Sequence, residues 1–161
     1  LEGLSPKQNR EIPPLNYEWV YALKEQFPHL TIVLNGGIQS LEECEQHLTK
    51  VDGVMLGRAA YQTPWLLSTV DSRLFGAEDP ALTRESVIVK LSAYVDDYLA
   101  NGGRLNHVTR HILGLFHQQP GGRLVRRALS EGAHLIDADG KVLLAALAEV
   151  TQRHGKESVV E

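Results

Sequence analysis

The sequence predicts an α/β fold, in which two β/α units are followed by a region of helices alone. Two short apolar runs, at residues 30–34 and 53–56, each end in a turn that contains glycine. Beyond residue 80 the apolar side chains recur at helical spacing only. Two parallel strands would leave exposed sheet edges. We therefore expect either the C-terminal piece of a larger barrel or a sheet that other chains complete.

The first part of the chain should alternate between loop, helix and strand. Residues 1–16 are rich in proline and predict a loop. Asn16 can cap a helix over residues 17–26, and Pro28 ends it. That helix carries an apolar stripe made of Trp19, Val20, Leu23 and Phe27. The elements expected next are a strand at 30–34, a helix at 41–49, a strand at 54–56 and a helix from about 59 that is interrupted near 64.

The second part is predicted to be a separate helical domain. Residues 76–80 indicate the boundary, which gives domains of 1–77 and 78–161. Thr83 can cap a long helix to about Ala100, with shorter helices expected at 106–117, 123–130 and 141–154. The inner face of the long helix that Thr83 caps should carry Val87, Leu91, Tyr94, Val95 and Tyr98. Aromatic side chains at helical spacing predict core positions rather than base-stacking platforms for Tyr61, Trp65, Tyr94 and Tyr98.

The two glycine turns are the candidate ligand site. Glycine lets a backbone approach a ligand closely, and peptide N–H groups at a helix start attract anions. Either turn alone could be a simple connection. In a (β/α)8 barrel, however, the loops after the seventh and eighth strands frequently bind phosphate together. The pair predicts a phosphate-bearing ligand that is held by Asn35, Gly36, Gly37, Gly57 and Arg58.

Basic residues are concentrated locally, although the net charge of −4 gives no global nucleic-acid signature. Residues 98–130 contain no Asp or Glu, and Arg123 and Arg126 share one helical face there, next to Arg127. This charge pattern is compatible with an RNA surface or with a merely solvated face. Near the N-terminus, Lys7, Asn9 and Arg10 form a second cluster that suits an anionic or nucleotide substrate. His107 and His111 have no third ligand, which favours a role without metal.

Cysteine usage and apolar runs indicate the compartment. The lone Cys44 excludes an internal disulfide, fits a reducing cytoplasmic environment and is expected to be a structural thiol. No apolar run approaches the ~20 residues of a membrane span, and no signal peptide is recognisable. The chain opens at Leu1 and its single methionine is Met55, so we expect a processed or truncated product.

Several motifs in order resemble the tRNA-dihydrouridine synthases, most closely their A subfamily. They lie at residues 3–15, 35–38, 52–58, 109–116 and 120–123, and the resemblance covers nearly the whole chain. It implies an FMN-dependent TIM barrel followed by a helical domain that helps to hold tRNA. In that family NADPH reduces the flavin, which then reduces a uridine of the tRNA D-loop to 5,6-dihydrouridine.

The resemblance also implies roles for individual residues. Asn35, Gly36 and Gly37 match one FMN phosphate segment, and Gly57 with Arg58 matches the other. Lys7 and Arg10 match positions that touch tRNA near the modified base. Arg123 and Arg126 match tRNA-binding arginines of the helical domain.

The family's catalytic cysteine has no counterpart in this sequence, because it belongs to the first half of the barrel and Cys44 lies in another segment. The resemblance therefore implies the C-terminal half of an oxidoreductase, with no catalytic residue in this chain and a missing N-terminal barrel half as partner. We expect the isolated chain to be inactive. The alternatives are a stand-alone helical RNA-binding module without catalysis and another phosphate-binding barrel enzyme, such as an aldolase or isomerase. The acid-free, arginine-rich helical extension argues against the latter.

Overall fold

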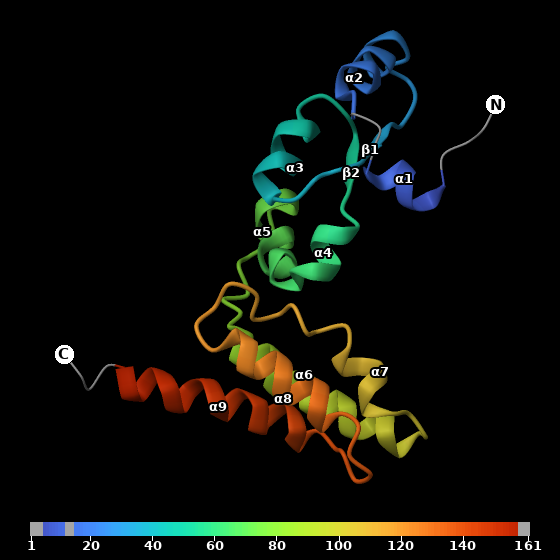
Figure 1. Cartoon of the computed structure of the whole chain (residues 1–161). Coiled ribbons are helices and arrows are strands. Elements are labelled where there is room, and N and C mark those ends of the chain that lie inside the picture. Colours follow the sequence, from blue (N-terminus) through green and yellow to red (C-terminus); the bar gives the residue numbers. More distant parts are fainter. Residues whose placement is uncertain (1–4, 12–14, 158–161) are drawn as a thin grey trace. The chain divides into compact units, whose positions relative to one another are not determined.

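The computed structural model describes residues 5–11 and 15–157. It divides into two compact units, Leu1–Gly57 and Arg58–Glu161, which we describe separately. The first contains α1 (Pro6–Glu11), α2 (Tyr17–Gln26), β1 (Val33–Asn35), α3 (Leu41–Leu48) and β2 (Gly53–Met55) (Figure 1). The second consists of α4 (Arg58–Gln62), the 3-10 helix η1 (Pro64–Thr69), α5 (Val70–Phe75), α6 (Arg84–Ala100), α7 (Leu105–Thr109), α8 (Gly122–Gly132) and α9 (Lys141–Glu157). The protein is thus a mostly helical α/β structure with a small parallel sheet, as its class predicted.

Helix α1 corrects the prediction of a loop at the N-terminus, although residues 12–14 lie outside the described part. Ser5 and Gln8 form a reciprocal cap: the Gln8 N–H donates to Ser5 Oγ (3.3 Å), and the Ser5 N–H donates to Gln8 Oε1 (3.0 Å). Pro6 occupies the first helical position, where its missing N–H costs nothing. The proline that suggested a loop therefore starts a helix.

The sheet has two strands that pair in parallel, with Val33 opposite Gly53, Leu34 opposite Val54 and Asn35 opposite Met55. Both strands are shorter than the apolar runs predicted. Leu34 points inward and is 1% exposed, whereas Val33 and Met55 stay exposed. Helix α3 contributes the other buried side chains, Leu41, Cys44 and His47, at spacings that place them on one face.

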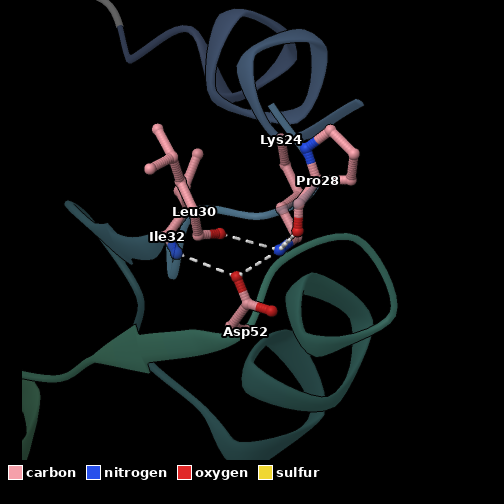
Figure 2. Close-up of polar contacts among 5 residues, drawn as sticks. All are labelled: Lys24, Pro28, Leu30, Ile32 and Asp52. Atoms are coloured by element: carbon pink, nitrogen blue, oxygen red, sulfur yellow. Dashed lines mark hydrogen bonds and ion pairs between the residues drawn. The ribbon is translucent and has the colours of Figure 1, made fainter. Parts of the chain in front are cut away.

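A polar cluster closes the N-terminal end of this sheet (Figure 2). The Ile32 N–H donates to Asp52 Oδ2 (2.8 Å), and the Asp52 N–H donates back to the Ile32 carbonyl (3.1 Å). Lys24 Nζ lies 2.7 Å from the same carboxylate oxygen and also donates to the carbonyls of Leu30 and Pro28. Asp52 therefore ties α2 to both strands, and it takes the Ile32 N–H that a longer β1 would have used.

Helix α2 begins at Tyr17 and ends at Gln26, as predicted, but its apolar stripe does not form a core within this chain. None of its residues is buried, and Trp19 is 77% exposed. The Asn16 side chain makes no capping hydrogen bond either. Exposed apolar side chains on a surface helix are typical of a face that packs against another structure.

The second unit is a helical bundle with its own core. Thr83 caps α6 through reciprocal hydrogen bonds with Ser86, and α6 ends at Ala100, as predicted. Helix α9 packs against α6 and α8 (Figure 1), and the N–H of Gly140, the residue before α9, donates to Asp96 Oδ1 on α6 (2.9 Å). The fully buried side chains of this core include Ile88, Val95, Val125, Leu129, Leu143 and Ala146.

Two expectations for this unit need correction. Helix α7 ends at Thr109, and the residues up to about 119 form successive turns rather than the predicted helix to 117. Tyr94, expected on the inner face of α6, is 57% exposed, and so is Tyr61. The contacts divide the chain after Gly57, whereas the proposed barrel boundary at 77/78 stays a prediction.

We expect the stability of the first unit to depend on the Asp52 carboxylate. The Ile32 N–H and then Lys24 lower the pKa of Asp52 below its ordinary value of 3.8. A lowered native pKa stabilises the fold above pH ~4, and that stabilisation is lost as the pH falls through the native pKa. Asp52→Asn should therefore lower the urea midpoint, followed by circular dichroism, at pH 7 and progressively less toward pH 3. Asp97→Asn, an exposed carboxylate of α6, is the control. A difference between Asp52→Asn and wild type that is constant with pH would contradict this role.

Candidate functional site

The turn after β1 has a backbone conformation that requires glycine. Gly36 has a φ of 135° and Gly37 a φ of 69°, both in the region that L side chains rarely adopt. A Cβ atom on Gly37 would also lie 2.6 Å from Leu15 Cδ1. Both the torsion angles and the space available therefore explain the glycine pair.

The parallel register places the second turn beside the first. Asn35 pairs with Met55, so the chain leaves β1 at Gly36 and leaves β2 at Leu56 at the same end of the sheet. Gly57 follows directly, and Arg58 is the first residue of α4 and of the second unit. The structure thus brings Asn35, Gly36 and Gly37 to the sheet end where Gly57 also lies. The participation of Arg58 remains a prediction.

The start of α3 does not provide the anion site that its position after the turn suggested. Ser40 Oγ accepts a hydrogen bond from the Glu43 N–H (3.2 Å), and Glu43 Oε2 accepts one from the Gln39 N–H (2.7 Å). This helix end is already capped by a carboxylate, which would repel a phosphate. The available donors are therefore the peptide groups of the turn itself.

Tyr17 orients one of those peptide groups. Its hydroxyl donates to the Gly36 carbonyl (2.7 Å). In a trans peptide the C=O and N–H bonds point in opposite directions, so the Gly37 N–H points away from Tyr17. No described residue accepts a hydrogen bond from that N–H. The turn therefore presents a fixed peptide donor that has no acceptor among the described residues.

Tyr17 is itself held by α3. Its ring packs edge-on against His47, with centroids 4.6 Å apart, and His47 is buried. The Tyr21 hydroxyl shares a hydrogen bond with His47 Nδ1 (2.6 Å). Burial raises the pKa of Tyr21, with a smaller contribution from Glu18, so its hydroxyl keeps its proton at neutral pH. Sequence reasoning missed Tyr17, because 19 residues separate it from Gly36 and no local pattern links them.

The predicted tRNA residues of the first unit lie on α1. The Lys7 side chain is exposed to solvent. Arg10 also belongs to α1, but its side chain lies outside the described part of the structure. Their proposed place near a target base remains a prediction.

The predicted arginines of the second unit lie together on α8. Arg123 and Arg126 are exposed and line a groove of about 600 Å³, which Arg110 and His117 also line. Arg127 differs from them: its Nε lies 2.8 Å from Glu131 Oε1, and that carboxylate raises the pKa of Arg127. The acid-free segment ends one residue before Glu131, so sequence alone did not reveal this ion pair.

The remaining histidines of the basic segment have neighbours of their own. Arg110 Nε donates to His111 Nε2 (3.0 Å), and His107 Nδ1 lies 3.5 Å from the Tyr98 hydroxyl. Within the described residues, no three His, Cys, Asp or Glu side chains gather closely enough to hold a metal ion. Nor does any helix of that part have the length and apolar character to cross a membrane.

Comparison with known proteins gives one consistent result. Residues 2–152 match the dihydrouridine synthase (Dus) family. The chain is 52% identical over 152 residues to a tRNA-dihydrouridine(20/20a) synthase of Vibrio vulnificus, covering 94% of this chain and 47% of the relative. It is 56% identical over 134 residues to the protein of that name from Pseudomonas aeruginosa, covering 83% and 40%. The chain thus spans about half the length of these curated relatives. Together with the two glycine turns at one end of a parallel sheet, the match shows that the chain belongs to the dihydrouridine synthase family.

Proposed function

We propose that this chain is the C-terminal half of an FMN-dependent tRNA-dihydrouridine synthase, a cytoplasmic enzyme that uses NADPH to reduce uridine in the tRNA D-loop. The observation that carries the proposal is the paired glycine turn, which presents the Gly37 N–H at the sheet end from which Gly57 also emerges. The family match and the names of the relatives supply the reaction.

The residues of the turn fit a cofactor phosphate. Gly36 and Gly37 let the backbone turn closely against Leu15, and the Gly37 N–H lacks an acceptor among the described residues. Asn35 and Gly57 lie at the same end of the sheet, where they would help to bind the phosphate, and Arg58 would add a charge-assisted hydrogen bond. A bound flavin would supply hydride transfer, while these residues would hold and orient its phosphate end.

We assign no catalytic residue to this chain. Cys44 has no exposed surface, so its thiol cannot reach a substrate. Lys7 and Arg10 would instead contact tRNA near the target base, and Arg123 and Arg126 would contact it from the helical unit. The proton donor would then come from the N-terminal half of the barrel.

The exposed apolar surface of the first unit supports a missing barrel half. Trp19, Val33 and Met55 are 77%, 57% and 52% exposed, although each is a large apolar side chain. A two-stranded sheet is marginally stable in water without further strands or helices. The other strands of a barrel would cover such a surface and give both sheet edges a partner.

Activity should require that other half. We expect no dihydrouridine when this chain is incubated with unmodified tRNA, FMN and NADPH, because the acid is absent. The chain joined to the N-terminal half of the Vibrio vulnificus relative should form dihydrouridine, measured by mass spectrometry of digested tRNA. Conversion by the chain alone would refute its inactivity. tRNA binding without conversion by the joined protein would favour the stand-alone RNA-binding module.

Tyr17→Phe should weaken flavin binding in the joined protein. The variant loses one neutral hydrogen bond that fixes the Gly36–Gly37 peptide, which predicts a Kd for FMN roughly two- to tenfold higher by fluorescence titration. Tyr21→Phe is the matched control, because Tyr21 lies on the same helix and contacts His47 but has no hydrogen bond to the turn. Equal FMN affinities for wild type and Tyr17→Phe would contradict the role of the Tyr17 hydroxyl in FMN binding.

The arginines of α8 should control the salt dependence of tRNA binding. Each phosphate that an arginine neutralises contributes about 0.7–0.9 to the slope of log K against log salt. Arg123→Ala with Arg126→Ala should therefore weaken binding and flatten that slope by about one to two units, without changing FMN content. Filter binding across a salt series measures it, and Arg127→Ala serves as the control. A wild-type slope for the double variant would show that these arginines are solvent-exposed but do not contact tRNA phosphates.

A further inference from the structure

The groove beside Arg123 is formed within the second unit by backbone segments in close contact. One wall is the end of α4 with Thr63, the residue before η1, and the other is the loop at 110–119 with the start of α8. The two walls meet where Gly114 packs on the Gln62 carbonyl so closely that a Cβ atom would not fit. The groove is therefore held open by main-chain packing rather than by flexible side chains.

The arginine side chains that line this groove attract anions. Arg110, Arg123 and Arg126 line it, and no acidic residue of the described chain does so. Helix α8 begins after Gly121, which has no side chain to cap it, and no described residue accepts a hydrogen bond from the Arg123 N–H. A phosphate there would meet guanidinium groups and an uncapped helix end together.

The groove also presents an aromatic ring. Tyr61 was expected in the core but is 57% exposed. Its ring packs edge-on against His111, at 5.7 Å between centroids and an interplanar angle of 78°. An exposed aromatic ring in a groove lined by arginines offers a stacking surface for a nucleobase.

Carboxamide groups lie in the same groove. Gln62, Gln118 and Gln119 line it, and each can both donate and accept hydrogen bonds with the edge of a base. Gln118 has a φ of 57°, a conformation that costs energy for a residue other than glycine and that often occurs in binding loops. The groove volume of about 600 Å³ lies within the range of small-molecule sites.

We infer that this groove binds a single unstacked nucleotide of RNA, with its phosphate at Arg123 and Arg126 and its base against Tyr61. The inference rests on the proposed function and specifies how the second unit contacts tRNA. It differs from binding through charge alone in one measurable respect: stacking contributes affinity without changing the number of counterions released.

Tyr61→Ala in the joined protein provides the test, with unmodified tRNA transcript as the probe in fluorescence anisotropy at several salt concentrations. We expect the Kd to rise by roughly five- to 150-fold with the salt slope unchanged. Tyr61→Phe keeps the ring and should bind like wild type. Tyr94→Ala is the matched control, because Tyr94 is also 57% exposed but does not line the groove.

Three results would overturn the inference: wild-type affinity for Tyr61→Ala, an equal loss for Tyr61→Phe, or an equal loss for Tyr94→Ala. The dihydrouridine assay separates this outcome from failure of the proposed function. If the joined protein forms no dihydrouridine but its tRNA binding depends on Tyr61, the result would support nucleotide binding in the groove and refute the enzymatic assignment.

Discussion

The mutual hydrogen bonds between Asp52 and Ile32 are the constraint on which the candidate phosphate site depends. They lie immediately before the first pair of the parallel sheet, Val33 and Gly53, and Lys24 adds a charge to the same carboxylate. A slip of one residue would move Leu34 out of the core and would separate the ends of the two strands. The cluster at the beginning of the strands therefore determines where the glycine turns lie at their far ends.

Local signals predicted much of the fold because they act over a few residues. The Thr83 cap and the length of α6 follow from side chain to backbone hydrogen bonds within one turn. The predicted helix at 106–117 failed for a tertiary reason: Gly114 packs against the Gln62 carbonyl, and the segment forms tight turns instead. Periodicity likewise placed Tyr61 and Tyr94 on helices but did not determine that both rings face solvent.

The candidate phosphate site was predictable only in part, for a similar reason. Gly36 and Gly37 were identified from residue type, because backbone positions with a positive φ angle favour glycine. No sequence pattern identified Tyr17, because its hydroxyl reaches Gly36 only when α2 is packed beside α3. Residues that orient a ligand-binding peptide from another helix thus become visible in the structure and not in the sequence.

The two candidate sites would bind anions by different physical means. In the first unit a neutral peptide N–H is fixed by Tyr17, so little reorganisation is needed when a ligand arrives. In the second unit exposed arginines would act through their charges, whose attraction is screened by salt. A cofactor that must remain bound through many turnovers suits the first arrangement, whereas a tRNA that must be released after each turnover suits the second. This division would let a chain of net charge −4 bind a polyanion without a basic surface overall.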